Sequence, residues 1–262
     1  MSLILPQRGR IRQAAAGGFT DPSDLFVGGY NGGWWDLTDT STLFEEYTSP
    51  TTTPATGDPI GYVNDKSGVG DDLVASANDT TRPTLIAGGG AQFLRNSIQK
   101  LTAGLTTTIS SSVLYVAMVY EHSPAPAGGT RYMSVGVIGT SDAGSALYSA
   151  ILYTNSISPS KIGSYRNATV TASIAATAST LYLVEMLYTG SSNTIYLNTS
   201  SNSGTTVGGS FGIEDVRFAV NVQGANAETF KLYEGLIINK DIVASGEQAD
   251  LRTYWNDKYS IY

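Results

Sequence analysis

The stretch SVLYVAMVYE at residues 112–121 is almost continuously apolar, and a second stretch, LYLVEMLY at residues 181–188, has the same character. Apolar runs of this length, bounded by turn residues, fit strands that are buried on both faces. Shorter strand-like segments surround them, separated by Gly, Ser, Asn or Pro, at residues 131–138, 145–153, 161–166, 169–175, 193–198, 216–223 and 229–239. This spacing of strands and turns predicts a β-sandwich or a β-barrel.

The composition agrees with an all-β domain. The chain has 262 residues, of which 41% are hydrophobic and only 14% are charged, and it contains 29 Gly and 16 Tyr. Tyrosine favours strands and glycine favours turns. A single all-β domain of this length is common, and we find neither an internal repeat nor a second domain. The chain has no Cys, which excludes disulfide bonds, a cysteine nucleophile and thiolate metal sites.

Charge and hydropathy exclude several classes of partner. The chain has 15 basic and 22 acidic residues, which gives a net charge of −7. It therefore lacks the basic face that binds phosphates, and we expect neither nucleic acid nor membrane as a partner. No apolar run reaches the roughly 18–20 residues of a transmembrane helix. A Ser-His-Asp triad would have to use the one histidine, His122, which we expect at an exposed loop edge instead.

Residues 1–18 form a separate compositional unit. They contain Arg8, Arg10 and Arg12 and no acidic residue, so the rest of the chain carries −7 − 3 = −10. A cationic arm on an acidic body suggests docking, for example onto a neighbouring copy of the chain. The alternative is a disordered terminus, as most termini are. The apolar residues precede the arginines, the reverse of a secretory signal peptide, so we expect synthesis in the bacterial cytoplasm without a signal peptide.

One helix is expected near the C-terminus, at about residues 245–259. The segment SGEQ, which starts at Ser245, has a capping-box pattern with Ser245 as the N-cap. Leu251, Trp255 and Tyr259 then follow one another by one helical turn on the same face. We expect this face to pack onto the sandwich.

Several motifs occur in an order that resembles a known family. They are WWDLTDTSTLF at 34–44, GYVNDKSGVG at 61–70, RPTL at 82–85, KLYEGLII at 231–238, SGEQ at 245–248 and LRTYWNDKY at 251–259. The chain resembles the concanavalin A-like (laminin-G-like) jelly-roll domains, above all those of tailed-phage and prophage structural proteins. It departs from them in VGDD at 69–72 and QFLR at 92–95, so an activity tied to those positions is not expected to carry over.

The resemblance implies a single jelly-roll β-sandwich over residues 19–262, with residues 1–18 as an N-terminal arm. It also implies a non-enzymatic virion structural protein, such as a capsid decoration, spike or tail-associated subunit, located in the phage particle. Its partners would be other virion proteins and copies of itself. The alternative function is a carbohydrate-binding adhesion module that recognises a host surface polysaccharide, and a third is a glycan hydrolase.

Hydrolase activity would require a pair of carboxylates. Glucanases of this fold carry two glutamates a few residues apart on one inner strand, whereas Glu185 and Glu234 each stand alone in an apolar strand. We therefore expect no catalytic residues and no enzyme. Glu185 has two interpretations: it lies on an outward face of mixed polarity, which we favour, or it points inward and needs a partner such as Arg217 or Lys231.

One turn suggests a calcium site. Asp65, Asp71 and Asp72 lie close together in the sequence with Ser67, and oxygen ligands of this kind suit Ca²⁺. Some laminin-G-like relatives bind this ion. Asp and Gly also favour turns for backbone reasons alone, which is the interpretation we prefer, and no other cofactor is expected.

The segment YNGGWWD at residues 30–36 has the chemistry of a sugar site. Aromatic faces beside Asp, Asn and Gly can hold a sugar ring, so Tyr30, Trp34, Trp35 and Asp36 are the candidate glycan-binding residues. Side chains alternate along a strand, so one tryptophan can face the core and the other can face solvent. The alternative, which we favour, is core packing, because large aromatic side chains are mostly buried.

Overall fold

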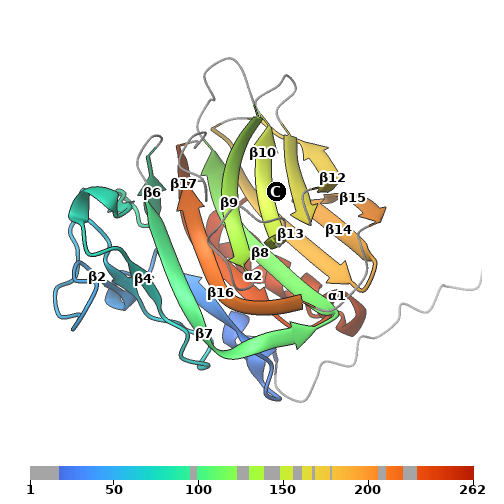
Figure 1. Cartoon of the computed structure of the whole chain (residues 1–262), viewed down its shortest axis with the longest axis horizontal. Coiled ribbons are helices and arrows are strands. Elements are labelled where there is room, and N and C mark those ends of the chain that lie inside the picture. The colour runs from blue at the N-terminus through green and yellow to red at the C-terminus, as the bar shows by residue number, and fades with distance from the viewer. Residues whose placement is uncertain are drawn as a thin grey trace, which may run out of the picture.

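The computed structural model describes the chain except residues 1–17, 95–98, 123–129, 139–147, 156–160, 167–168, 178, 206–210 and 221–228. Within the described residues, two antiparallel sheets pack face to face as a β-sandwich (Figure 1). The predicted all-β sandwich is therefore confirmed. The assembly arm proposed at residues 1–18, with Arg8, Arg10 and Arg12, lies outside the described residues apart from Gly18.

The strands of the described residues form two sheets. Sheet A contains, in spatial order, β15 (Ser200–Thr205), β14 (Ser192–Leu197), β13 (Leu181–Thr189), β8 (Val113–His122), β17 (Phe230–Ile238), β6 (Ala91–Phe93) and β5 (Thr84–Leu85), with β1 (Gly32–Asp36) also paired to β17. Sheet B contains β12 (Thr169–Ala175), β11 (Lys161–Arg166), β10 (Tyr148–Asn155), β9 (Thr130–Ile138), β16 (Phe211–Val220), β7 (Lys100–Ser111), β4 (Leu73–Ala75), β3 (Tyr62–Val63) and β2 (Leu43–Phe44). The short helices are η1 (Pro22–Phe26), η2 (Thr40–Thr42), η3 (Asp79–Thr81) and α1 (Ile242–Ser245), followed by the longer α2 (Gln248–Tyr259).

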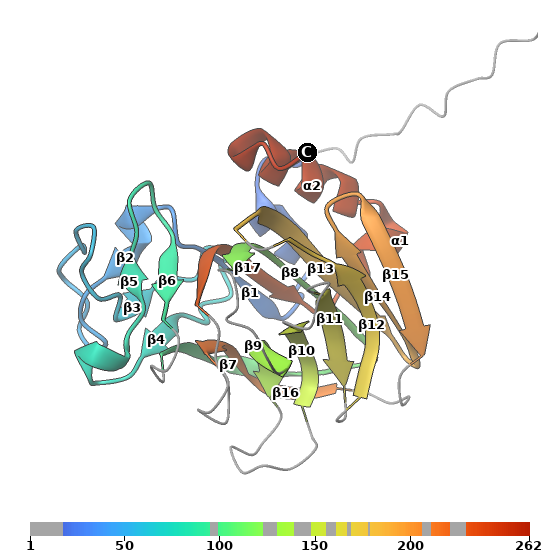
Figure 2. The ribbon, with the colours of Figure 1, turned by 90° about the horizontal axis from the view of Figure 1, so that it is seen from above.

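Sheet A is covered on both faces. On β8, Val116 and Met118 belong to the core between the sheets, whereas Tyr115 and Ala117 belong to a second apolar cluster on the outer side. Residues of η1 and α2 complete that outer cluster, and Figure 2 shows α2 lying along this side of the sheet. The double cover explains why the 112–121 run is apolar at nearly every position.

The C-terminal helix begins later than expected. Ser245 ends α1, whose N-cap is Asp241, and Gly246 then adopts a φ of 87°, which stops that helix. The predicted capping role of Ser245 is therefore wrong. The predicted face is confirmed, because Leu251 and Trp255 of α2 are fully buried. None of the helices in the described ranges is long and apolar enough to cross a membrane.

Candidate functional site

β1 carries both candidate tryptophans, and both are buried. Trp35 points into the sandwich core, where its ring centroid lies 5.6 Å from that of Phe218 and its Nε1 donates to the Asp71 carbonyl at 2.8 Å. Trp34 belongs to the outer cluster beneath α2. Trp34, Trp35 and Asp36 are 2%, 0% and 3% exposed. A glycan surface made of these three residues is therefore wrong, and the burial of the tryptophans that we favoured is confirmed: their side chains alternate as expected, and α2 covers the second face.

Glu234 on β17 is the centre of a hydrogen-bonded cluster beneath α2, and it is fully buried. Its Oε1 accepts from Lys258 Nζ at 2.7 Å and from the Tyr259 hydroxyl at 2.8 Å. Its Oε2 accepts from Trp34 Nε1 at 2.8 Å and from Trp255 Nε1 at 2.9 Å. Lys258, Tyr259 and Trp255 all belong to α2, so this carboxylate fixes the helix to the sheet.

Asp36 extends this cluster to the 61–70 turn. It lies opposite Glu234 in the register of β1 and β17, and it accepts from Lys258 Nζ at 2.8 Å and from Lys66 Nζ at 3.3 Å. Lys66 also pairs with Asp39 at 2.8 Å. Two buried acids thus share one lysine. We call the cluster the polar lock; its members are Trp34, Asp36, Asp39, Lys66, Glu234, Trp255, Lys258 and Tyr259.

Burial and these partners set the pKa values in the polar lock. Burial raises the pKa of Glu234 above 4.5, the charge of Asp36 adds to the rise, and Lys258 opposes it. Burial acts in the same direction on Asp36, but hydrogen bonds from Lys258 and Thr38 and the charges of Lys258 and Lys66 outweigh it. The pKa of Asp36 therefore lies below 3.8.

Glu234→Gln should change how stability depends on pH. The pKa of Glu234 is raised in the folded state, so its stabilising contribution is present below about pH 4.5 and is lost as the pH rises through the folded-state pKa. Stability of the variant should therefore fall less than that of the parent as the pH rises above about 4.5. Urea unfolding at a series of pH values measures this difference. Asp36 titrates in both proteins and so does not contribute to it. Identical pH profiles would contradict the raised pKa of Glu234.

Glu185 on β13 is a second buried acid beneath α2. Its Oε2 accepts from Arg252 Nε at 2.7 Å, and its Oε1 accepts from Gln248 Nε2 at 3.1 Å and from the Tyr115 hydroxyl. The outward face that we favoured is confirmed, because Glu185 alternates with the core residues Val184 and Met186, but α2 covers this face and Glu185 is fully buried. Its partner is Arg252 of the helix, so the suggested partners Arg217 and Lys231 are wrong. Burial raises the pKa of Glu185, while Arg252, Tyr115 and Gln248 oppose the rise.

The three aspartates proposed for calcium act as acceptors for backbone amides. Asp65 accepts from four amides at 2.9 to 3.1 Å, Asp71 Oδ1 accepts from the Thr106 amide at 2.6 Å, and Asp72 Oδ1 accepts from the Asp65 amide at 2.7 Å. Across the described residues, no three His, Cys, Asp or Glu side chains group as a metal ion would require. These contacts favour the backbone role of Asp65, Asp71 and Asp72 in building the turn.

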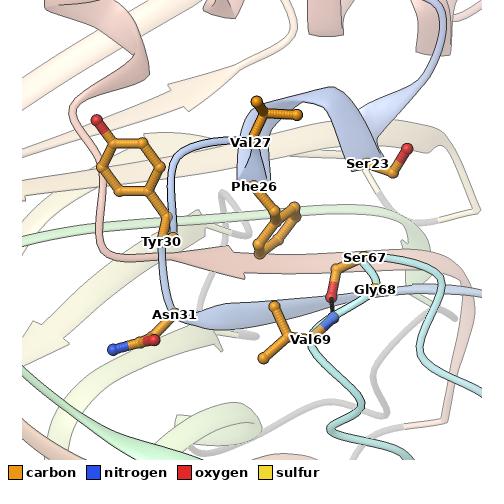
Figure 3. Close-up of a pocket in the computed structure, with 9 residues that line it drawn as sticks. Ser23, Phe26, Val27, Tyr30, Asn31, Ser67, Gly68 and Val69 are labelled. Atoms are coloured by element: carbon orange, nitrogen blue, oxygen red, sulfur yellow. Dashed lines mark hydrogen bonds between the residues drawn. The ribbon is translucent and has the colours of Figure 1, made fainter.

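Tyr30 is the one candidate glycan residue that stays partly exposed. It lines a surface hollow of about 370 Å³ between the turn that follows η1 and the 61–70 turn (Figure 3). Lys240 Nζ lies 4.6 Å from the centroid of its ring. Val27, on the same hollow, is 74% exposed. Of the four candidate glycan residues, Tyr30 therefore lies apart from the others: Trp34 and Asp36 belong to the polar lock, and Trp35 belongs to the core.

The buried acids can hold the fold together but cannot reach a substrate. A general acid or base must approach the proton that it transfers, whereas Glu185 and Glu234 are both 0% exposed. His122 is the last residue of β8, which agrees with its expected position at the edge of a strand. One sequence feature did indicate the buried cluster: an acid that stands alone in an apolar strand requires a partner. The sequence did not show that α2 supplies the partner residues.

Comparisons with known proteins extend this description. No protein-family model and no curated protein matches the chain. Among solved structures, a GH54 α-L-arabinofuranosidase soaked with a cyclic sulfate inhibitor has a TM-score of 0.60 at 11% identity, over 84% of this chain and 62% of that one. The binding domain of botulinum neurotoxin serotype D has a TM-score of 0.51 at 12% identity, over 71% of this chain and 49% of that one. The chain spans less than two thirds of these proteins, and at such identities the likeness shows the fold alone: a two-sheet β-sandwich.

Proposed function

We propose that the chain is a non-enzymatic structural protein of a phage particle, such as a capsid decoration, spike or tail-associated subunit, anchored through residues 1–18. The polar lock is the observation that carries the proposal. Asp36, Lys66 and Lys258 come from three motifs of the phage jelly-roll resemblance, and both lysines pair with the buried Asp36. Residues that make the sequence resemble those domains thus serve to assemble the sandwich, which suits a passive, rigid subunit.

The distribution of charge supports anchoring by the arm. Within the described residues, basic side chains of the body form ion pairs with acids of the body: Lys66, Arg82, Arg217, Lys231, Lys240, Arg252 and Lys258. The body therefore neutralises cations internally and keeps its excess of acids, −10 against +3 on residues 1–18. Opposite charges on the arm and the body favour contact between neighbouring copies or with another acidic virion protein.

Neutralising Arg8, Arg10 and Arg12 with glutamine should lower incorporation into particles by about tenfold or more, because the arm loses its attraction for an acidic neighbour. The sandwich should stay folded. Complementation of a phage that lacks the gene, followed by quantitative blotting of purified particles, measures incorporation. The matched control replaces Gln7 and Gln13 with alanine, which keeps the arm's charge. Equal incorporation of both variants would reject anchoring by charge.

Location is tested separately by immunogold electron microscopy of purified particles. Label over the head would identify a decoration protein, and label on the tail would identify a tail-associated subunit. A positive blot of the lysate with no protein in purified particles would reject the virion role.

A further inference from the structure

The hollow beside Tyr30 combines an apolar wall with an uncharged polar edge. Phe26 and Val69 face each other across the hollow, and Val27 lies at its edge with its side chain pointing away from Val69 (Figure 3). Val27 is the most exposed of the large apolar side chains among the described residues, at 74%. An apolar side chain at a concave surface leaves hydrocarbon in contact with water, which a ligand with an apolar face would relieve.

Asn31 supplies the polar edge. Its backbone is already engaged, because its amide donates to Asn239 Oδ1 at 2.8 Å and its carbonyl accepts from the Asn239 amide at 3.1 Å. Its side-chain amide, in contrast, makes no hydrogen bond to another described residue and carries both donors and an acceptor. Ser23 Oγ donates to Asp21 Oδ1 at 2.5 Å and keeps its acceptor capacity. The edge can therefore both donate to and accept from hydroxyl groups.

The cation beside Tyr30 is already paired. Lys240 lies over the Tyr30 ring at 4.6 Å, but its Nζ binds Glu247 at 2.6 Å and the Leu25 carbonyl at 3.3 Å. The described residues that line the hollow include no acidic or basic side chain. A charged ligand would meet no opposite charge among the lining side chains and would lose hydration, so the lining favours a neutral ligand.

We propose that this hollow binds one ring of a neutral sugar. A pyranose ring has an apolar C–H face that fits the wall of Phe26 and Val69, with Val27 at its edge, and hydroxyl groups that can bond to Asn31 and Ser23. The hollow, about 370 Å³, lies at the small end of the range for ligand sites. Tyr30 then acts as the aromatic border of the site. This inference goes beyond the virion role and does not depend on it, since binding is a property of the isolated chain.

Saturation-transfer NMR on the purified chain tests the proposal with three neutral probes: methyl α-glucoside, methyl α-galactoside and N-acetylglucosamine. At least one should bind, with a dissociation constant in the millimolar range because a shallow site contacts few ligand atoms. Tyr30→Ala should weaken binding by about tenfold. Val27→Asp should weaken it as well by placing a charge at the apolar edge of the hollow, and this exposed position carries little risk of unfolding. Thermal unfolding of each variant confirms that it is folded.

Tyr47→Ala is the matched control. Tyr47 is also a partly exposed tyrosine, at 37%, with a cation over its ring, the Arg82 guanidinium at 5.3 Å, but it does not line the hollow. Its variant should bind the sugar as the parent does. Absence of transfer to all three probes, or transfer that persists in both Tyr30→Ala and Val27→Asp, would overturn the proposal. Binding of N-acetylneuraminic acid and of none of the neutral probes would also overturn it. A third contradictory result is that a peptide of residues 1–18 shifts the amide NMR signals of residues 67–69 whereas the sugars do not.

Discussion

Lys258→Ala should lower the free energy of unfolding by about 3 kcal/mol, because it removes the cation that two buried carboxylates share. Lys258 Nζ lies 2.7 Å from Glu234 and 2.8 Å from Asp36, and those acids are 0% and 3% exposed. Without the lysine, two acids that the fold buries each lose a cationic partner. Lys66 remains beside Asp36 at 3.3 Å, so the greater part of the loss should come from Glu234. Urea unfolding at neutral pH measures the change.

Lys231→Ala is the control for this prediction. Lys231 pairs with Glu121 at 3.0 Å, but the two side chains are 31% and 20% exposed, so the loss should stay below about 1 kcal/mol. Adding Glu234→Gln to Lys258→Ala should recover part of the stability, because it removes the charge that lost its partner. Equal losses for the two lysine variants would mean that the polar lock is no stronger than a surface ion pair.

The sequence allowed the strands and the packing face of the helix to be predicted, because both are local patterns. The apolar runs at 112–121 and 181–188 became the central strands β8 and β13. The spacing of Leu251 and Trp255 identified the buried face of α2. Periodicity and turn residues are enough for such elements, since neighbours in sequence determine them.

The site could not be predicted in the same way, because its contacts are far apart in the chain. Lys258 and Asp36 are separated by 222 residues and Glu185 and Arg252 by 67. A strand pattern indicates which residues share a face of the sheet, but not what covers that face. Packing of the helix onto the sandwich was expected, but the strands that it would cover were not identified: α2 lies on the outer face of sheet A, over Trp34 and Glu185.

Gly61→Ala should lower the free energy of unfolding by about 3 kcal/mol or more, because no side chain fits at the start of the 61–70 motif. A Cβ at this position would lie 2.1 Å from the Glu45 carbonyl oxygen and 2.5 Å from the Glu46 carbonyl carbon. Both are backbone atoms, so a change of rotamer cannot relieve the overlap. The backbone is also held in place, because the Gly61 amide donates to the Phe44 carbonyl at 2.8 Å and its carbonyl accepts from the Ala75 amide at 2.9 Å.

Gly212→Ala is the matched control, since a Cβ there meets nothing within 4 Å. It lies in β16, and its replacement should change stability by less than about 1 kcal/mol and can raise it by restricting the unfolded chain. Thermal and urea unfolding of both variants measure how much stability is lost when a Cβ is added at a close backbone contact and at an open position. If Gly61→Ala is as stable as Gly212→Ala, the segment around Glu45 and Glu46 moves freely, and the glycine of this motif is not a steric requirement. The predicted large difference in stability would instead mean that the packed sandwich requires a glycine at this position, as it requires the polar lock.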